Sequence, residues 1–265
     1  MEIVALLLLI VFISWLCYKW QRKKSIGSEF FNNEYRIILQ DKVIFYMQLS
    51  ESDKVIFENR MQQFLSQVKI TGVHTTVEPL DKVFVAASAI IPIFAFSNWE
   101  YTNLNEVLLY PESFNEEFNM EIGQEKYVLG MVGTGAMQNI MILSQPSLRE
   151  GFNNKTDKNN TGIHEFVHLI DKTDGEVDGV AENLLDKQYL TPWINLMYKN
   201  IKEISTGKSD INPYGATSKA EFFAVVSEYF FEQPQLLQSG HPELYGLLEQ
   251  IFGNKKRMLT KAFLD

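Results

Sequence analysis

Two histidines four residues apart, with a glutamate directly after the first, form the pattern best suited to chemistry in this chain of 265 residues. The stretch TGIHEFVHLID holds His164, Glu165 and His168. On a helix, residues i and i+4 share one face, so both imidazoles can reach one metal ion. Glu165 is turned about 100° around the helix, which suits a general base beside the ion. A solvated histidine pair on an ordinary amphipathic helix is the alternative interpretation.

A third ligand is required, because catalytic zinc generally takes three protein ligands and keeps one position open. The single cysteine lies in the first apolar run and the other two histidines stand in turn-like sequence, so we expect a carboxylate. The candidates are the acidic residues between 174 and 186, and Glu221 and Glu228 in the apolar segment KAEFFAVVSEYFFE. Glu221 also completes a Ser-x-x-Glu pattern typical of a capping box. Periodicity alone separates neither a ligand from a cap nor Glu221 from Glu228.

The motif itself is predicted to lie on a buried helix. Asn160 or Thr161 can cap its start, and apolar residues flank both histidines. Asp171 falls three residues after His168 and could orient a histidine by accepting its second ring proton. A charge at the helix end is the alternative role for Asp171.

Helices are expected before the motif. Residues 34–70 predict helices separated near Ser50, where Ser50 or Ser52 can cap the second helix. Residues 77–96 are apolar and alanine-rich enough for a buried helix, which Pro92 must end or kink.

Short strands complete the predicted α+β fold. Residues 105–114 and 139–148 are β-branched or aliphatic runs closed by proline, which predicts strands followed by turns. If residues 139–144 lie at the edge of the sheet, they could pair with an extended peptide. The glycines in residues 130–137 predict a hairpin turn rather than a phosphate-binding loop, because no Gly-Lys-Ser/Thr follows them.

The first 24 residues predict a membrane anchor with a basic flank, and residues 25–265 a single catalytic domain. The segment from Ile3 to Trp20 would span about 27 Å as a helix, close to a hydrocarbon core of about 30 Å. The basic residues at 22–24 place the rest of the chain in the cytoplasm, as a single-pass membrane protein. A cleaved signal peptide is the alternative, but Glu2 stands where a basic start is expected and no small-residue cleavage site follows.

The charge balance argues against a nucleic-acid partner. The whole chain carries a net charge of -9, and without its first 24 residues it has 20 basic and 32 acidic residues. Such a surface repels phosphate backbones.

Several segments together resemble the Mlc titration factor A family of zinc metallopeptidases, which are related to the anthrax lethal factor catalytic domain. The resemblance rests on HEFVHLID, on PYGATSKAEFFAVVSEYFFEQPQLL, and on VAASAIIPIFAF followed by VLLYPESF. It runs with gaps from about residue 35 to the C-terminus. It implies a zincin-like α+β fold with a small antiparallel or mixed sheet and an active-site helix carrying the HExxH motif.

The resemblance also implies the site. His164, His168 and Glu221 become the ligands of one zinc ion per chain, and Glu165 the base that activates the zinc-bound water for peptide hydrolysis. Tyr214, seven residues before the ligand glutamate, would face the oxyanion; a turn tyrosine after a proline is the alternative. The expected partners are a peptide or protein substrate and, in the other functional hypothesis, a regulator protein bound by a membrane-tethered module with vestigial activity.

Two departures from the family pattern bear on these expectations. Family members are soluble, so the predicted anchor is an addition that puts an inherited cytosolic substrate in doubt. The segment after the motif helix reads DGVAEN, where the family leads us to expect a proline after Gly-Val. The pocket is therefore expected to be shaped differently.

Overall fold

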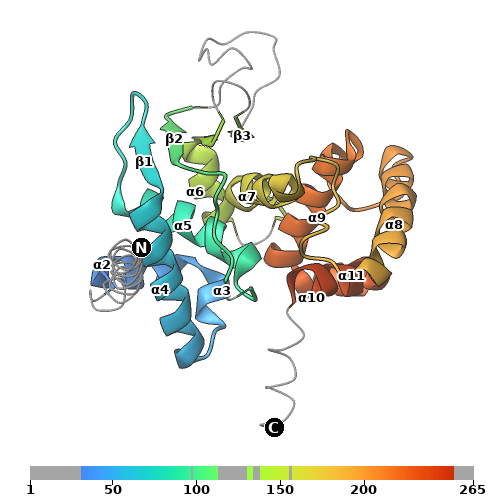
Figure 1. The fold of residues 1–265 in the computed structure, drawn as a ribbon, viewed down its shortest axis with the longest axis horizontal. Coiled ribbons are helices and arrows are strands. Elements are labelled where there is room, and N and C mark those ends of the chain that lie inside the picture. Colours follow the sequence, from blue (N-terminus) through green and yellow to red (C-terminus); the bar gives the residue numbers. More distant parts are fainter. Residues whose placement is uncertain (1–30, 97, 113–129, 134–137, 155–156, 254–265) are drawn as a thin grey trace, which may run out of the picture.

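The computed structural model describes residues 31–96, 98–112, 130–133, 138–154 and 157–253, and Figure 1 shows their arrangement. The predicted anchor in residues 1–24 lies outside the described residues. Within the described part of the chain, none of the helices combines the length and apolar character needed to cross a membrane.

The fold is rich in helices and contains one small mixed sheet, in agreement with the predicted α+β class. The strands lie in the order β1-β2-β4-β3, with β1, β2 and β4 parallel and β3 antiparallel to β4. Their bounds are β1 Lys69–Gly72, β2 Glu106–Tyr110, β3 Gly130–Val132 and β4 Ile140–Ser144.

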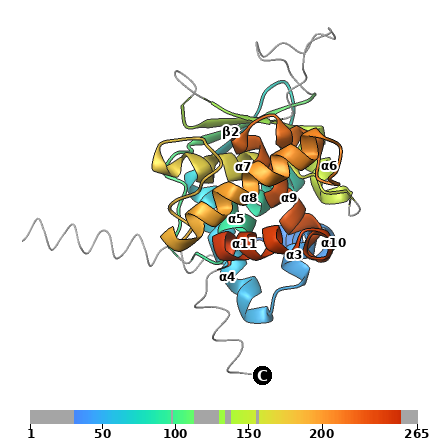
Figure 2. The same cartoon turned by 90° about the vertical axis from the view of Figure 1, so that its right-hand side faces the viewer.

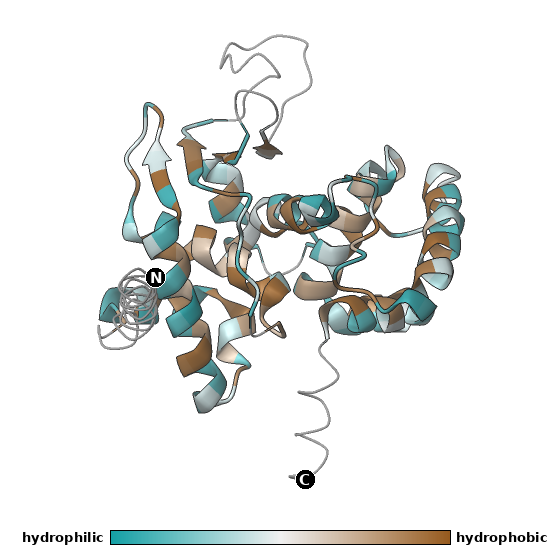
Figure 3. Ribbon diagram, in the orientation of Figure 1, coloured by the Kyte–Doolittle hydropathy of each residue, from teal (hydrophilic) through white to brown (hydrophobic). Residues whose placement is uncertain are grey.

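The sequence signals for the start of α4 and for the end of α5 are confirmed. Ser50 caps α4, since its hydroxyl oxygen accepts a hydrogen bond from the Asp53 amide, and α5 ends one residue after Pro92. In Figure 3, α5 is largely brown whereas α8 alternates between teal and brown, because α5 is buried around most of its circumference. The helices are α2 Asn33–Lys42, α3 Ile44–Met47, α4 Glu51–Gln67, α5 Pro79–Ile93, α6 Gln145–Asn153, α7 Thr161–Asp171, α8 Lys187–Ser205, α9 Lys219–Glu232, α10 Pro234–Gly240 and α11 Pro242–Phe252, with 3-10 turns η2 Lys172–Asp174 and η3 Pro213–Ala216.

The strand predictions hold in part. Strands form within residues 105–114 and 139–148, and β3 pairs antiparallel with β4 as a hairpin requires, although residues 134–137 lie outside the described chain. The expected helix up to residue 70 is wrong at its end, because Ile70 is a β1 residue paired with Val107. The expected turn after β4 is also wrong. Ser144 caps α6 directly, and Pro146 fits the first turn of a helix, where no amide hydrogen is needed.

A further correction concerns the edge of the sheet. β4 lies between β2 and β3, so residues 139–144 have a neighbouring strand on each side and leave no room for a peptide. The described edge next to β4 is formed by β3. The hydrophobic run of β4 reflects burial in the middle of the sheet, and Met141, Ile142 and Leu143 are fully buried.

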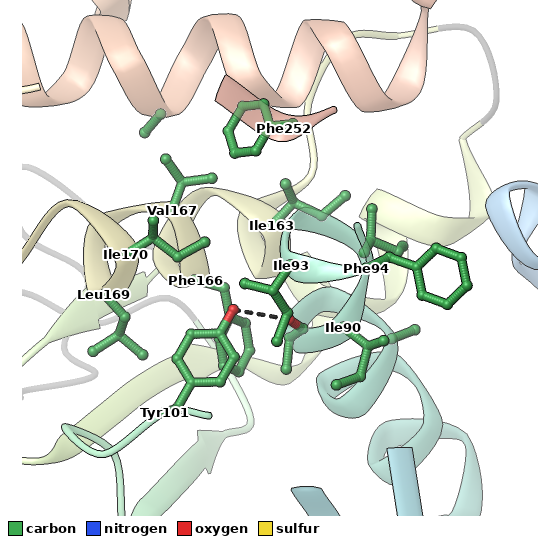
Figure 4. Packing of buried hydrophobic residues seen from close by; sticks show 14 of the residues in the cluster. Ile90, Ile93, Phe94, Tyr101, Ile163, Phe166, Val167, Leu169, Ile170 and Phe252 are labelled. Carbon is green, nitrogen blue, oxygen red and sulfur yellow. Dashed lines mark hydrogen bonds between the residues drawn. The ribbon is translucent and has the colours of Figure 1, made fainter. Parts of the chain in front are cut away.

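The helix α7 occupies the centre of the molecule, between the sheet with its helices and the C-terminal helices α8 to α11 (Figures 1 and 2). Figure 4 shows its apolar face, with Phe166 near Tyr101 and with Ile163 near Ile93. The rings of Tyr101 and Phe166 meet edge to face with centroids 5.2 Å apart. A Cβ on Gly162 would lie 2.2 Å from the Ser88 hydroxyl oxygen, so α5 and α7 cross in close contact. The position of α7 is therefore determined by its packing in the hydrophobic core.

The start of α5 is fastened to α6 by a buried carboxylate. Asp81 is fully buried and accepts hydrogen bonds from Arg149, at 2.7 and 3.0 Å, and from the Gln145 amide at 2.8 Å. Replacing Asp81 with alanine leaves the guanidinium and the amide without their partner, and we expect unfolding stability to fall by about 3 kcal/mol.

Chemical denaturation of the Asp81→Ala protein measures this loss. Glu51→Ala is the matched control, because the Glu51 side chain is 90% exposed and its ion pair with Lys54 is a surface contact. An Asp81→Ala protein as stable as the control would show that the network contributes nothing to the fold.

Candidate metal centre

The two motif histidines leave α7 on the same face. Asn160 caps the helix, its side-chain oxygen accepting a hydrogen bond from the Ile163 amide at 3.1 Å. One turn apart, the His164 and His168 rings have centroids 4.7 Å apart, and their Nε2 atoms lie 3.1 Å from each other. The helix therefore presents two ring nitrogens to one point in space.

Glu221 reaches that point from the first turn of α9. One carboxylate oxygen, Oε2, lies 2.9 Å from His164 Nε2 and 3.4 Å from His168 Nε2. The capping alternative is also resolved. The Ser218 hydroxyl caps α9 by accepting from the Glu221 amide at 3.0 Å, so the backbone of Glu221 joins the cap while its carboxylate faces the histidines.

These three side chains can hold a metal ion. Ligand bonds of about 2.0 to 2.2 Å in a tetrahedral zinc site place neighbouring ligand atoms about 3.3 to 3.6 Å apart. The three distances between the donor atoms here, 2.9, 3.1 and 3.4 Å, are close to those edges. Among the described residues, His164, His168 and Glu221 form the one group of potential ligands this close together. The positions of the donor atoms are compatible with the predicted role of these residues as metal ligands.

The other carboxylates considered from the sequence have different partners. Asp174 and Asp178 accept hydrogen bonds from backbone amides of their own loop, at 3.2 and 3.0 Å. Asp171 is fully buried and accepts from the Gly179 amide at 2.9 Å, and it makes no hydrogen bond to the buried Nδ1 of His168. The expected orientation of a histidine by Asp171 is therefore not found; the residue fastens the loop after α7 instead. Burial raises the pKa of Asp171 to about 6.

Glu228 takes the orienting role. Its Oε1 atom lies 2.6 Å from Nδ1 of His164, and its Oε2 accepts from the Asn160 backbone amide at 2.5 Å. A carboxylate bound to Nδ1 fixes the ring so that Nε2 points into the site. Glu228 stands two helical turns after Glu221 on the same face of α9, which is why the sequence did not tell the two apart.

The electrostatics favour a cation at this point. Burial opposes a charge on His164, but the charge of Glu228 and the hydrogen bonds of Glu221 and Glu228 raise the pKa of His164 well above its ordinary value. Burial likewise opposes the charge on Glu221, yet contacts with His164 and His168 lower its pKa overall. The carboxylates thus stabilise positive charge where the ring nitrogens converge.

Glu165 stands beside the group. It is 5% exposed, and burial is the main cause that raises its pKa above the ordinary glutamate value. A carboxylate whose basicity is raised by burial is suited to take up a proton near neutral pH. Its predicted role as a base is chemically consistent with this environment.

Tyr214 lies on η3 next to the histidines. Its ring centroid is 6.0 Å from that of His164, and the residue is 49% exposed. Burial, followed by the charges of Glu221 and Glu165, raises the pKa of Tyr214 to about 12, so its hydroxyl keeps its proton at neutral pH. The turn is fixed by Asn212, which caps it and donates to Asn159 at 3.0 Å.

Replacing Glu228 with glutamine should weaken metal binding about 10- to 100-fold, because the Nδ1 contact loses its charge and the His164 ring loses its fixed orientation. Competition with a chromophoric zinc chelator measures this affinity. Glu243→Gln on α11 is the matched control, because its side chain is 74% exposed. Equal zinc affinity in the two variants would contradict the orienting role.

Proteins of known sequence include relatives of this chain. A Synechocystis sp. protein designated uncharacterized protein slr2042 is 27% identical over 250 residues, covering 87% of each chain. Mlc titration factor A of Escherichia fergusonii is 27% identical over 204 residues, which cover 72% of this chain and 76% of that protein. The Pectobacterium atrosepticum protein of the same name is 28% identical over 178 residues, 61% of this chain and 64% of its own. Since a model of the family described as glucose-regulated metallo-peptidase M90 matches residues 17–253, the chain belongs to that family.

Proposed function

We propose that the protein is a zinc-dependent peptidase that hydrolyses peptide bonds with Glu165 as general base. The observation that carries the proposal is the convergence of two imidazole nitrogens and one carboxylate oxygen, 2.9 to 3.4 Å apart, next to a buried glutamate. Membership of a metallopeptidase family supports the same conclusion.

Each side chain has a distinct part in the proposed reaction. A zinc ion held by His164, His168 and Glu221 would supply Lewis acidity and would lower the pKa of a water molecule toward about 7. Glu165 accepts the proton of the attacking water and passes it to the leaving amine. Tyr214 donates its phenolic hydrogen to the oxygen that becomes negative in the tetrahedral transition state.

The substrate would bind in an extended form along β3. The Gly133 amide donates to the Ile140 carbonyl, and alternation in an antiparallel pair then turns the amide and carbonyl groups of Gly130 and Val132 away from β4. These groups face the described edge of the sheet next to α7, where a peptide would add as a further strand. We therefore propose that β3, and not residues 139–144, is the strand that pairs with the peptide substrate.

Membrane attachment belongs to the proposal as well. It is supported by the sequence of residues 1–24, an apolar run followed by basic residues, which predicts a single-pass anchor with the catalytic part in the cytoplasm. A protease-accessibility assay on intact and permeabilised cells, with a tag at the C-terminus, would locate the catalytic part.

A second candidate function is the binding of a regulator protein on the same fold. Its support is the name of several relatives, Mlc titration factor A, which describes those proteins as titrating a factor called Mlc. A groove that binds polypeptide serves a peptidase and a binding module equally. Measuring the affinity of wild type and Glu165→Gln for purified Mlc, beside a peptide-library digest, separates the two. Tight binding by both, with no peptide cleaved by the zinc-loaded wild type, favours the module.

Glu165→Gln should retain one zinc ion per chain and lose peptide hydrolysis, because an amide of similar shape cannot accept the proton. Metal analysis and a peptide-library digest of the full chain provide the two measurements. Glu243→Gln, the exposed control, should cleave peptides as fast as wild type. Removing zinc from this control with a chelator should abolish its activity, and adding zinc back should restore it. Wild-type protein that binds no stoichiometric zinc would refute the proposal at its first step.

Tyr214→Phe should lower kcat about 100- to 1000-fold with little change in zinc content, because one donor to the developing oxyanion is lost. Tyr198→Phe, at a tyrosine of α8 that is 55% exposed, is the matched control and should leave kcat unchanged. If Tyr214→Phe keeps the wild-type kcat, the tyrosine is only a turn residue, the alternative considered from the sequence.

A further inference from the structure

Gly130, the first residue of β3, packs its backbone directly against the side chain of Glu165, the proposed general base. A Cβ on Gly130 would lie 2.5 Å from Cγ, 2.8 Å from Cδ and 2.6 Å from Oε1 of Glu165. Non-bonded carbon atoms normally stay about 3.5 to 4.0 Å apart, so no side chain larger than hydrogen fits here while Glu165 keeps its place.

The backbone of Gly130 does not itself require glycine. Gly130 is not among the described glycines with a positive φ angle, which are Gly175, Gly179 and Gly207. An alanine can adopt the extended conformation of a strand without strain. Within the described part of the chain, it is therefore the Glu165 side chain that leaves no room for a side chain at position 130.

The backbones of both residues are held in place by their neighbours. Gly130 is paired with Leu143 of β4, a fully buried residue in an inner strand of the sheet. Glu165 is 5% exposed, and its helix is packed against α5, α9 and β3. A Cβ at position 130 would therefore be accommodated mainly by displacing the Glu165 carboxylate, through rotation about its side-chain bonds.

We propose that Gly130 is a positioning residue for Glu165: the bare backbone at the start of β3 lets the base lie flat against the strand on which the substrate would bind. This inference rests on the proposed peptidase function. It adds a residue that neither ligates metal nor carries a titratable group, and it couples the substrate-binding edge to the placement of the base.

Activity of the Gly130→Ala full chain tests the catalytic consequence. Misplacement of a catalytic group by about 1 Å can cost on the order of 100-fold in rate, so we expect kcat to fall about 10- to 100-fold. KM should change less than about twofold and zinc should remain at one ion per chain, because no ligand is touched. Gly246→Ala in α11 is the matched control, since a Cβ there meets no atom within 4 Å. A Gly130→Ala enzyme with wild-type kcat would overturn the inference.

A stability cycle tests the contact without relying on activity. Gly130→Ala should lower the melting temperature by several degrees when Glu165 is present, and much less in the Glu165→Ala background, where Cγ, Cδ and Oε1 are gone. If Gly130→Ala alone does not fold but the double variant does, the contact is equally supported. Equal losses in both backgrounds would show that something other than Glu165 excludes a side chain at position 130.

The two measurements distinguish the two ways of failing. If zinc-loaded wild type cleaves no peptide, the proposed function fails, and the catalytic part of the inference fails with it, while the cycle still decides whether Gly130 fixes the Glu165 side chain. If wild type cleaves peptides and Gly130→Ala cleaves them equally fast, the peptidase function stands and the positioning role is wrong.

Discussion

One imidazole ring, that of His164, is held from both of its nitrogens by carboxylates of a single helix. Glu221 lies 2.9 Å from Nε2 and Glu228 lies 2.6 Å from Nδ1. The two glutamates are seven residues apart, and so rise about 10.5 Å along α9 on the same face. This arrangement fixes where α7 and α9 cross, since a shift of either helix along the other would break one of the two contacts. The position of the Glu221 carboxylate relative to the motif histidines follows from it.

The same contacts compensate for the burial of a carboxylate on the apolar helix α9. Glu228 is 5% exposed on a helix whose residues Phe222, Phe223 and Val225 are also buried, and an unpaired buried carboxylate costs several kcal/mol. Its two oxygens are satisfied by His164 and by the backbone amide of Asn160. Formation of the α7–α9 contact is therefore coupled to burial of the core.

The cap of the motif helix belongs to the same network. The Asn160 side chain accepts from the Ile163 amide and donates to Glu232 at 2.9 Å, one turn beyond Glu228 on α9. Burial raises the pKa of Glu232 to about 7. The start of α7, the orientation of His164 and the face of α9 are thus determined by one set of hydrogen bonds, and the ligand geometry does not depend on the motif helix alone.

The sequence predicts the parts of this arrangement that depend on local spacing. The shared face of His164 and His168, the cap at Ser50 and the end of α5 near Pro92 all follow from neighbours within a few residues. The roles of Glu221 and Glu228 could not be separated, because both lie on one face of α9 and the angle at which α7 crosses decides which nitrogen each one meets. β1 and the inner position of β4 were missed for a related reason: strand pairing brings together residues far apart in the chain. Asp171 was on the expected face, but the loop after α7 folds back and offers the Gly179 amide instead.

The burial that raises the basicity of Glu165 also explains why the site needs support from so many elements. Glu165, Glu221 and Glu228 bring three acidic groups close to two imidazoles in a poorly solvated place, and the charges of Glu221 and Glu228 add to burial in raising the pKa of Glu165. A bound divalent cation would offset the repulsion between these carboxylates, and so would stabilise the arrangement that raises the basicity of Glu165. The contacts of Glu228 with the His164 ring and with the Asn160 amide hold α7 and α9 together around these acidic groups.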